Sequence, residues 1–267
     1  MIDTHTHTFF SADSSEIPEQ LLLAAIDKGL KYLAITDHVD RDYLFGEIRQ
    51  TRQIDMAEYY PVIKELKEKY SDKITIAIGA EFGYAKRAEA LYQDIAGDYP
   101  ELDIIINSVH TVKGRDAYFP DFFTNYEKVS AYSLYLEAIL ESINADYPYD
   151  VIAHIGYVTR NAPYTDRALY YKDYEDSIDE ILKSIISKGK ALEVNTRAHS
   201  HNTPFLPCKE ILLRYKELGG ELLTFASDAH KAREVGGGYA DTKEFLLSLG
   251  YKYLTGYLKH KPIMFDL

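Results

Sequence analysis

Two histidines, His5 and His7, lie two residues apart near the start of the sequence. In an extended strand this spacing points both imidazoles to the same face, so they could bind one metal ion together. Such a pair is often only solvated, or belongs to an expression tag. Asp228 and His230 repeat the spacing near the other end of the sequence. Each pair closes an apolar run, and this repetition favours a metal site.

The apolar pattern predicts strands alternating with helices. Besides the segment that carries His5 and His7, we expect strands at residues 31–36, 74–80, 102–109, 150–153, 191–196 and 222–227. We expect helices at about residues 18–28, 55–70, 87–95, 128–144, 172–188 and 208–218, and a charged loop after His38 that runs to Arg52. Apolar runs such as 102–109 are typical of parallel strands covered on both faces.

The ends of the predicted strands distinguish an open sheet from a closed barrel. A polar residue that could bind metal, or an arginine, follows every one of these strands, and a barrel brings all the carboxyl ends to one mouth. An open sheet would separate several of them. The sequence also lacks a long linker or a low-complexity tract. We therefore expect residues 1–267 to form one α/β domain, a distorted TIM-like (β/α)7 barrel with a metal site at the carboxyl ends of its strands.

Nine imidazole and carboxylate side chains make up the predicted metal site. They are His5, His7, Asp13, His38, Glu81, His110, His154, Asp228 and His230. Nine ligands are too many for one ion, so we expect two or three divalent cations with roughly four to six nitrogen and oxygen ligands each. Glu81 and Asp228 could each bridge two of them. The alternative, a structural hydrogen bond to the backbone, is reasonable for any single residue but improbable for all nine.

This ligand set predicts hydrolytic chemistry. Water shared between neighbouring divalent cations has a pKa near neutrality and can attack as hydroxide, on either a phosphate ester or a carbonyl group. Arg160 and Arg197 favour a phosphate, because each follows a predicted strand and a guanidinium can hold two phosphate oxygens at once. The alternative for both arginines is ion pairing with neighbouring acids.

Composition limits the compartment and the partners. The formal charge of -12 opposes nonspecific binding to nucleic acid, which depends on lysine and arginine. No apolar run approaches the roughly 20 residues that span a bilayer, and no leader-like segment precedes His5. The single Cys208 allows no disulfide framework. We expect a cytoplasmic protein with a small-molecule substrate and no nucleic acid or membrane partner; the oligomeric state is left open.

The motifs resemble, in order and spacing, those of the polymerase and histidinol phosphatase (PHP) family. They are His5-Thr6-His7, Thr36-Asp37-His38, Glu81, Asn107-Ser108-Val109-His110, Ala153-His154 and Ser227-Asp228-Ala229-His230. The length of the chain and the loop after His110 look like those of the family's stand-alone phosphatases. The resemblance implies a (β/α)7 barrel, a trinuclear site described with zinc, manganese or iron, and hydrolysis of L-histidinol phosphate to L-histidinol and phosphate.

The resemblance also implies how the ligands are shared. It assigns His5, His7, Glu81 and Asp228 to a first metal, Glu81, His110 and His154 to a second, and His38, His230 and Asp13 to a third. Asp37 matches a motif and is expected to orient its neighbour rather than to bind metal.

Two other functions stay open. The same site could hydrolyse nucleotides, oligonucleotides or phosphotyrosine, although the acidic charge counts against oligonucleotides. The chain could also be a non-catalytic metal-binding module, against which the complete ligand set argues. Four aromatic residues after His110 could enclose the imidazole of a substrate or simply pack: Tyr118, Phe119, Phe122 and Phe123. His199 and His201 follow Arg197 closely enough to line the pocket but are expected to lie in a solvated loop, and His260 is expected to be exposed.

Overall fold

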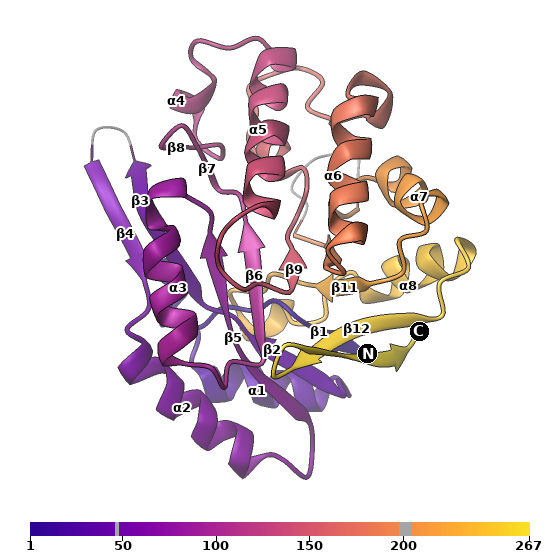
Figure 1. Cartoon of the computed structure of the whole chain (residues 1–267). Helices are drawn as coiled ribbons and strands as arrows, with labels where there is room; N and C mark the ends of the chain where they lie inside the picture. The colour runs from indigo at the N-terminus through magenta and orange to yellow at the C-terminus, as the bar shows by residue number, and fades with distance from the viewer. Residues whose placement is uncertain (46–47, 198–203) are drawn as a thin grey trace.

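A parallel sheet forms the centre of the protein (Figure 1). The structure, a computed structural model, describes residues 1–45, 48–197 and 204–267. In this part of the chain seven strands follow one another around the sheet in the order β1-β2-β5-β6-β9-β10-β11, and every neighbouring pair is parallel. These are β1 (Ile2–Asp3), β2 (Tyr32–Ile35), β5 (Thr75–Gly83), β6 (Ile104–Ser108), β9 (Val151–Ile152), β10 (Ala191–Asn195) and β11 (Leu223–Ala226).

The first and last of these strands meet and close the sheet. The amide of Thr4 donates to the carbonyl of Phe225 at 2.9 Å, and the amide of His7 donates to the carbonyl of Ala229 at 2.8 Å. A parallel bridge also pairs Thr6 with Ala229. The predicted α/β barrel of the TIM-like type is thereby confirmed, with β1 only two residues long.

The helices cover the outside of the sheet and confirm the predicted alternation. They are α1 (Pro18–Asp27), α2 (Met56–Lys69), α3 (Glu89–Asp98), α4 (Pro120–Phe123), α5 (Lys128–Ile143), α6 (Glu175–Ser187), α7 (Lys209–Glu217) and α8 (Tyr239–Ser248), with 3-10 turns η1 (Lys86–Ala88), η2 (Tyr157–Thr159), η3 (Tyr171–Asp173) and η4 (Ala232–Glu234). Pro18 begins α1 at the position where its missing N–H costs nothing. Gly189, with φ +64°, allows the left-handed turn after α6.

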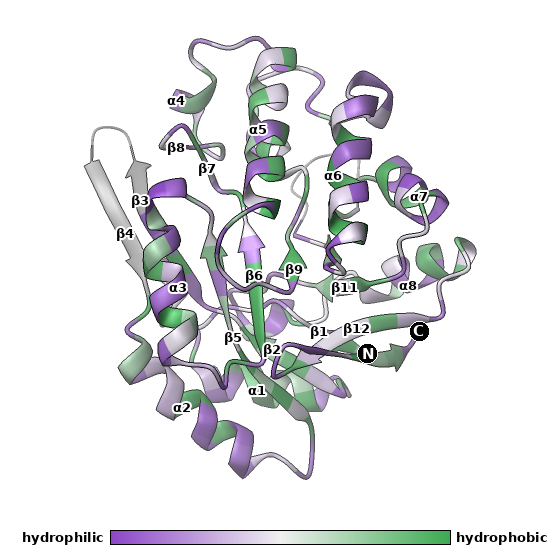
Figure 2. Ribbon diagram, viewed as in Figure 1, coloured by the Kyte–Doolittle hydropathy of each residue, from purple (hydrophilic) through white to green (hydrophobic). Residues whose placement is uncertain are grey.

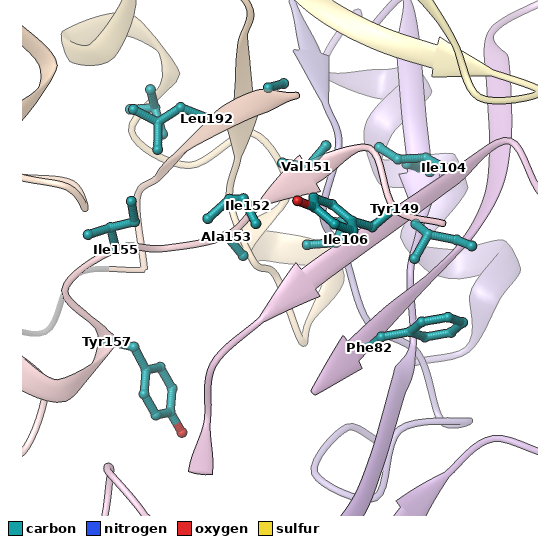
Figure 3. Packing of buried hydrophobic residues seen from close by; sticks show 14 of the residues in the cluster. Phe82, Ile104, Ile106, Tyr149, Val151, Ile152, Ala153, Ile155, Tyr157 and Leu192 are labelled. Atoms are coloured by element: carbon teal, nitrogen blue, oxygen red, sulfur yellow. The ribbon is translucent and has the colours of Figure 1, made fainter. Parts of the chain in front are cut away.

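The core lies between the strands and the helices. Ile104, Ile106 and Phe82 are fully buried, and Figure 3 shows Ile104 and Ile106 of β6 near Val151 of β9, with Phe82 on the other side of β6. Figure 2 shows β6 hydrophobic along most of its length and hydrophilic at its tip, where Asn107 and Ser108 stand. The side chains of β6 thus change from apolar core residues to polar residues at its carboxyl end. Among the described residues no helix is both long and apolar enough to cross a membrane.

The segment predicted as a charged loop after His38 is a hairpin. Strands β3 (His38–Phe45) and β4 (Ile48–Gln53) pair antiparallel, so the loop prediction was wrong. The sequence did not reveal these two strands because the strands of a hairpin can pair with each other without the apolar face that marks a core strand. The start of β3 also pairs parallel with β5, with His38 opposite Glu81. The hairpin therefore fixes His38 beside Glu81.

Two further pairs of strands lie outside the barrel sheet. Strands β7 (Thr111–Val112) and β8 (Arg115–Asp116) form a short hairpin after His110. Strands β12 (Tyr253–Leu258) and β13 (Lys261–Asp266) form the C-terminal hairpin, drawn in yellow in Figure 1 near the starts of the barrel strands. The hydroxyl of Tyr32, at the start of β2, donates to the carbonyl of Tyr257 at 2.9 Å and ties this hairpin to the barrel.

Candidate metal centre

Glu81 is the centre of the cluster at the carboxyl ends of the strands. Its side chain is fully buried, and its two oxygens face five imidazole nitrogens at 2.7 to 3.6 Å. These nitrogens belong to His5, His7, His38, His110 and His154. The hydroxyl of Ser108 also donates to Glu81 at 2.6 Å. Strands β1, β3, β5, β6 and β9 thus converge on one carboxylate, as the closed barrel requires.

Asp13, Asp228 and His230 complete the cluster on its other side. The Asp228 carboxylate lies 3.4 Å from Nε2 of His7. One Asp13 oxygen lies 3.4 Å from Nε2 of His230 and 3.6 Å from Nε2 of His38. The structure therefore brings all nine residues of the predicted site together. Asp13 reaches the cluster from the first loop, between His38 and His230, the two histidines with which the family resemblance groups it.

The ligand atoms gather in several sets rather than one. Four groups of three ligand atoms each lie within 4.8 Å of one another. The groups are His7, His38 and His230; His5, His7 and Glu81; His38, Asp40 and His110; and Glu81, His110 and His154. Since His7, His38, Glu81 and His110 each belong to two groups, the cluster has the form of adjoining sites that share ligands.

Several buried atoms of the cluster have no partner in hydrogen-bond geometry among the described residues. These atoms are Nε2 of His5, Nε2 of His7, Nδ1 of His38, Nδ1 of His154, Oδ2 of Asp40 and Oε2 of Glu81. A buried polar atom without a partner costs roughly 1–3 kcal/mol. Most of them are nitrogen and oxygen donors that point toward a common centre, which is what divalent cations require. The residues present therefore fit bound metal.

The electrostatics of the cluster agree with this fit. Burial opposes the charged form of His5, but the Glu81 and Glu193 carboxylates outweigh burial and raise the pKa of the imidazole well above its usual value. Burial likewise opposes ionisation of Glu81, yet the neighbouring histidines hold the pKa of its carboxyl well below the usual range. The buried carboxylate thus depends on positive charge around it, which protons or divalent cations can supply.

Two backbone positions in the cluster are strained. His154 has φ +23° and Asp228 has φ +52°, values that side chains other than glycine rarely adopt. Both residues lie two positions after the end of a barrel strand, His154 after β9 and Asp228 after β11. The strain turns each side chain toward the cluster, and such strain is concentrated at functional sites.

Two buried carboxylates behind the histidines escaped the sequence prediction. The imidazole of His110 donates from Nδ1 to Asp40 at 3.0 Å, and that of His5 donates from Nδ1 to Glu193 at 2.8 Å. Each bond leaves Nε2 of the same ring to face Glu81. Carboxylates in this position fix the tautomer and the orientation of a metal-binding histidine. The only sequence feature that could have pointed to Asp40 is its position two residues after His38. Glu193 gave no such indication, because it lies among the apolar residues of β10.

Gly83 makes room for one of these carboxylates. A Cβ atom at residue 83 would lie 1.4 Å from Oδ1 of Asp40, a distance that no side chain tolerates. Asp37, expected to orient a neighbour, accepts from the hydroxyl of Ser11 at 2.6 Å. The Ser11 oxygen in turn lies 3.1 Å from Nδ1 of His7. Asp37 thus acts on the ring of His7 through a serine.

The two predicted arginines stand beside Asp228. Arg160 is buried and donates to Asp228 at 2.9 Å and to Asn195 at 3.2 Å, and its Nε lacks a partner among the described residues. Arg197 is half-buried, with Nη1 3.7 Å from the Asp228 carboxylate and a hydrogen bond to Nδ1 of His230. The ion pairing considered as the alternative is therefore present. Both guanidinium groups nevertheless also line the cavity over the cluster.

That cavity has a volume of about 260 Å³. Its lining residues are Asp13, His38, Glu81, His110, Asp116, Tyr118, Phe119, Tyr157, Arg160, Arg197, Asp228 and His230. Of the four aromatic residues considered for substrate contact, Tyr118 and Phe119 line it, whereas Phe122 and Phe123 are buried in the core. His199 and His201 lie outside the described residues. His260, expected to be exposed, is only partly so, and Asp150 accepts from its Nδ1 at 2.8 Å.

The fold and the cluster together define a class, an α/β barrel with a histidine- and carboxylate-rich centre at the carboxyl ends of its strands and arginines beside it. A model of the PHP domain matches residues 3–197, about three quarters of the chain. The chain belongs to the PHP domain family.

Several relatives of this chain carry the name of a phosphatase. The histidinol-phosphatase of Lactococcus lactis is 33% identical over 233 residues, which are 87% of this chain and 85% of that protein. The probable histidinol-phosphatase of Clostridium acetobutylicum is 31% identical, over 88% of this chain and 89% of that protein. The solved structure of the histidinol phosphate phosphatase of Lactococcus lactis, complexed with zinc, L-histidinol and phosphate, matches 98% of this chain and 98% of its own, with a TM-score of 0.88 and 30% identity.

Proposed function

We propose that this protein is a metal-dependent phosphomonoesterase, a histidinol-phosphatase that hydrolyses L-histidinol phosphate to L-histidinol and phosphate, a reaction of histidine biosynthesis. One observation carries the proposal: the match over nearly the whole chain to a solved histidinol phosphate phosphatase that holds zinc, L-histidinol and phosphate. The arginines beside a cluster of nitrogen and oxygen donors suit the same chemistry.

Within this proposal the nine clustered residues hold two or three divalent ions, of zinc, manganese or iron. The proposed ligand sets are His5, His7, Glu81 and Asp228; Glu81, His110 and His154; and His38, His230 and Asp13. Bound cations of this kind lower the pKa of water toward neutrality and stabilise negative charge on phosphoryl oxygens. Asp228 and His230 lie beyond residues 3–197, so a complete ligand set needs the rest of the chain, and we propose that residues 1–267 act as one domain.

The residues of the chain prepare the phosphate for attack. Arg160 and Arg197 bind its nonbridging oxygens, and Asp228 orients both guanidinium groups by accepting from Arg160 and lying beside Arg197. Asn195 supports the same arrangement, since its side-chain oxygen accepts from Arg160 and from the amide of Arg197 at 2.9 Å. Holding the phosphate in one orientation lowers the barrier to attack by water.

Phosphate release tests the proposal. The metal-reconstituted protein is offered L-histidinol phosphate, a nucleoside monophosphate and p-nitrophenyl phosphate, with chelator-treated protein as the control. We expect a preference for histidinol phosphate of several orders of magnitude in kcat/KM and loss of activity on chelation. If all three esters are hydrolysed slowly and alike, the substrate assignment is wrong. If chelated, metal-free protein keeps its activity, the metallohydrolase assignment is wrong as well.

A further inference from the structure

Asn195, at the end of β10, contacts both the metal cluster and the two arginines. Its side chain is fully buried and does not line the cavity. Its backbone is fixed on both sides, because it pairs in parallel with Ala226 of β11, and its amide and carbonyl both bond to Leu206, at 2.8 and 2.7 Å. Any effect of this side chain on a substrate therefore passes through its neighbours.

The side-chain amide of Asn195 makes four hydrogen bonds. Its oxygen accepts from the guanidinium of Arg160 at 3.2 Å and from the backbone amide of Arg197 at 2.9 Å. Its nitrogen donates to the carboxylates of Glu193 at 2.8 Å and of Asp228 at 3.3 Å. Two acceptor sites and two donor hydrogens are all that this side chain has. It is thus held from four directions.

The chemistry of these four neighbours fixes which way the amide points. The guanidinium of Arg160 and the backbone amide of Arg197 can only donate, and the two carboxylates accept. An amide rotated by 180° would set its nitrogen against both donors and its oxygen against both carboxylates. An aspartate at this position would bring a third carboxylate against Glu193 and Asp228, and an apolar residue would leave buried polar groups without partners. The position therefore calls for an amide.

The two carboxylates tie this amide to the metal cluster. Glu193 also accepts from Nδ1 of His5 at 2.8 Å and from the backbone amide of His154 at 3.2 Å, so it holds two of the clustered histidines. Asp228, a member of the cluster, also accepts from Arg160 at 2.9 Å. The amide, the guanidinium and the Asp228 carboxylate thus form a closed triangle of hydrogen bonds. One planar group connects the residues that hold the histidines with those that hold the arginines.

The placement of the arginines relative to the cluster depends on this connection. A phosphate bound by the arginines must lie at the correct distance from the cluster, and an error of about 1 Å can cost roughly a hundredfold in rate. We propose that Asn195 is a positioning residue that sets the arginine pair relative to the cluster, a role that rests on the function proposed above. It acts on the phosphate, the part that all phosphate monoesters share, and not on the choice between them.

The test replaces Asn195 and measures phosphate binding as well as turnover. Asn195→Ala and Asn195→Ser are assayed at saturating metal with L-histidinol phosphate and p-nitrophenyl phosphate, and with inorganic phosphate as a competitive inhibitor. We expect kcat/KM to fall about tenfold to a hundredfold, by the same factor for both esters, and the inhibition constant of phosphate to rise. A variant that only folds less well would contain fewer active molecules, which lowers kcat and leaves the inhibition constant unchanged.

Asn107→Ala is the matched control. Asn107 is also a buried asparagine near the carboxyl end of a barrel strand, but its side chain donates to the carbonyl of Ser142 and accepts from the hydroxyl of Tyr147, both at 2.8 Å. Its replacement should lower stability and leave the inhibition constant of phosphate unchanged. An equal rise of that constant in both alanine variants would contradict a specific role for Asn195.

A double variant tests the path of the effect. In the Arg160→Gln background, Asn195→Ala should cause a clearly smaller loss than in the unchanged protein, because one of the two groups that Asn195 positions is absent. Fully additive losses, an unchanged inhibition constant, or failure of both Asn195 variants to fold would overturn the positioning role. Absence of a preference for histidinol phosphate in the unchanged protein would instead contradict the proposed substrate, and the measurements with p-nitrophenyl phosphate and inorganic phosphate would still decide the role of Asn195.

Discussion

The two ends of the barrel both bury carboxylates but treat them differently. At the amino end, Asp103 accepts from the amide of Ile78 at 2.9 Å and from Lys67, and Asp150 accepts from the amide of Ile105 at 2.8 Å. At the carboxyl end, Oε2 of Glu81 and Oδ2 of Asp40 have no partner in hydrogen-bond geometry among the described residues. The same kind of group is satisfied at one end and left with unused acceptor capacity at the other.

The carboxylates at the amino end stabilise the fold, whereas those at the carboxyl end belong to the candidate functional site. At the amino end the carboxylates join the starts of β6 and β9 to the C-terminal hairpin, whose Lys259 amide and His260 ring both donate to them. Such satisfied bonds stabilise the fold. At the carboxyl end, buried imidazole nitrogens and carboxylate oxygens face one another without forming a full set of hydrogen bonds. Such an arrangement destabilises a protein unless a ligand compensates it. The satisfied hydrogen bonds at the amino end offset this destabilisation at the carboxyl end.

The largest effect should follow from removing the central carboxylate of the carboxyl end. For Glu81→Gln we expect phosphate release to fall by at least about a thousandfold, since metal-assisted stabilisation of the reacting phosphate is worth several kcal/mol. Bound metal, measured by mass spectrometry of the purified protein, should fall in parallel. The metal-free variant should still unfold cooperatively. A variant that retains both metal and activity would show that the cluster is not organised around Glu81.

A smaller effect at the same end should come from Glu193, which touches a proposed ligand without belonging to the set. Glu193→Gln keeps the shape but weakens its bond to Nδ1 of His5. We expect metal affinity to fall about tenfold to a hundredfold, the usual cost of losing such a partner, as measured by competition with a chelator. Saturating metal should restore most of the activity. If excess metal does not restore it, Glu193 has a role other than positioning His5.

At the amino end the expected effect is on stability alone. Asp150→Asn weakens the bonds to the Ile105 amide and to His260, so we expect unfolding to become easier by about 1–3 kcal/mol in denaturant titrations. Activity below the unfolding transition should be unchanged, which is the opposite of the Glu81 result. A loss of kcat in the folded variant would mean that the two ends are coupled.

The smallest effect concerns pH at the same end. The hydrogen bond to Asp150 raises the pKa of His260. The stability that charged His260 contributes is therefore fully present below its unfolded pKa of about 6.5, and is lost as pH rises through the raised folded value. The stability difference between the protein and His260→Gln should shrink over that range. A difference that grows with pH would contradict the ion pair.

The sequence could predict the barrel and the nine clustered residues because both depend on local order, a strand followed by a polar residue. Asp40 and Glu193 escaped because their contacts are with rings brought near by folding; Glu193 lies 188 residues from His5 in the chain. The hairpin β3–β4 escaped because its strands carry charges where core strands are apolar. His260 was placed in solvent because its partner, Asp150, comes from a distant part of the sequence.

Closure of the barrel has a consequence for the order in which the protein can assemble. The strand that carries His5 and His7 is held by β11 and the residues after it, and the bond from Thr4 to Phe225 joins residues 221 apart in sequence. During synthesis these histidines therefore leave the ribosome well before the residues that hold their strand in place. Contacts this distant form late and slowly. The cluster is therefore complete only once β1 and β11 have paired and closed the barrel.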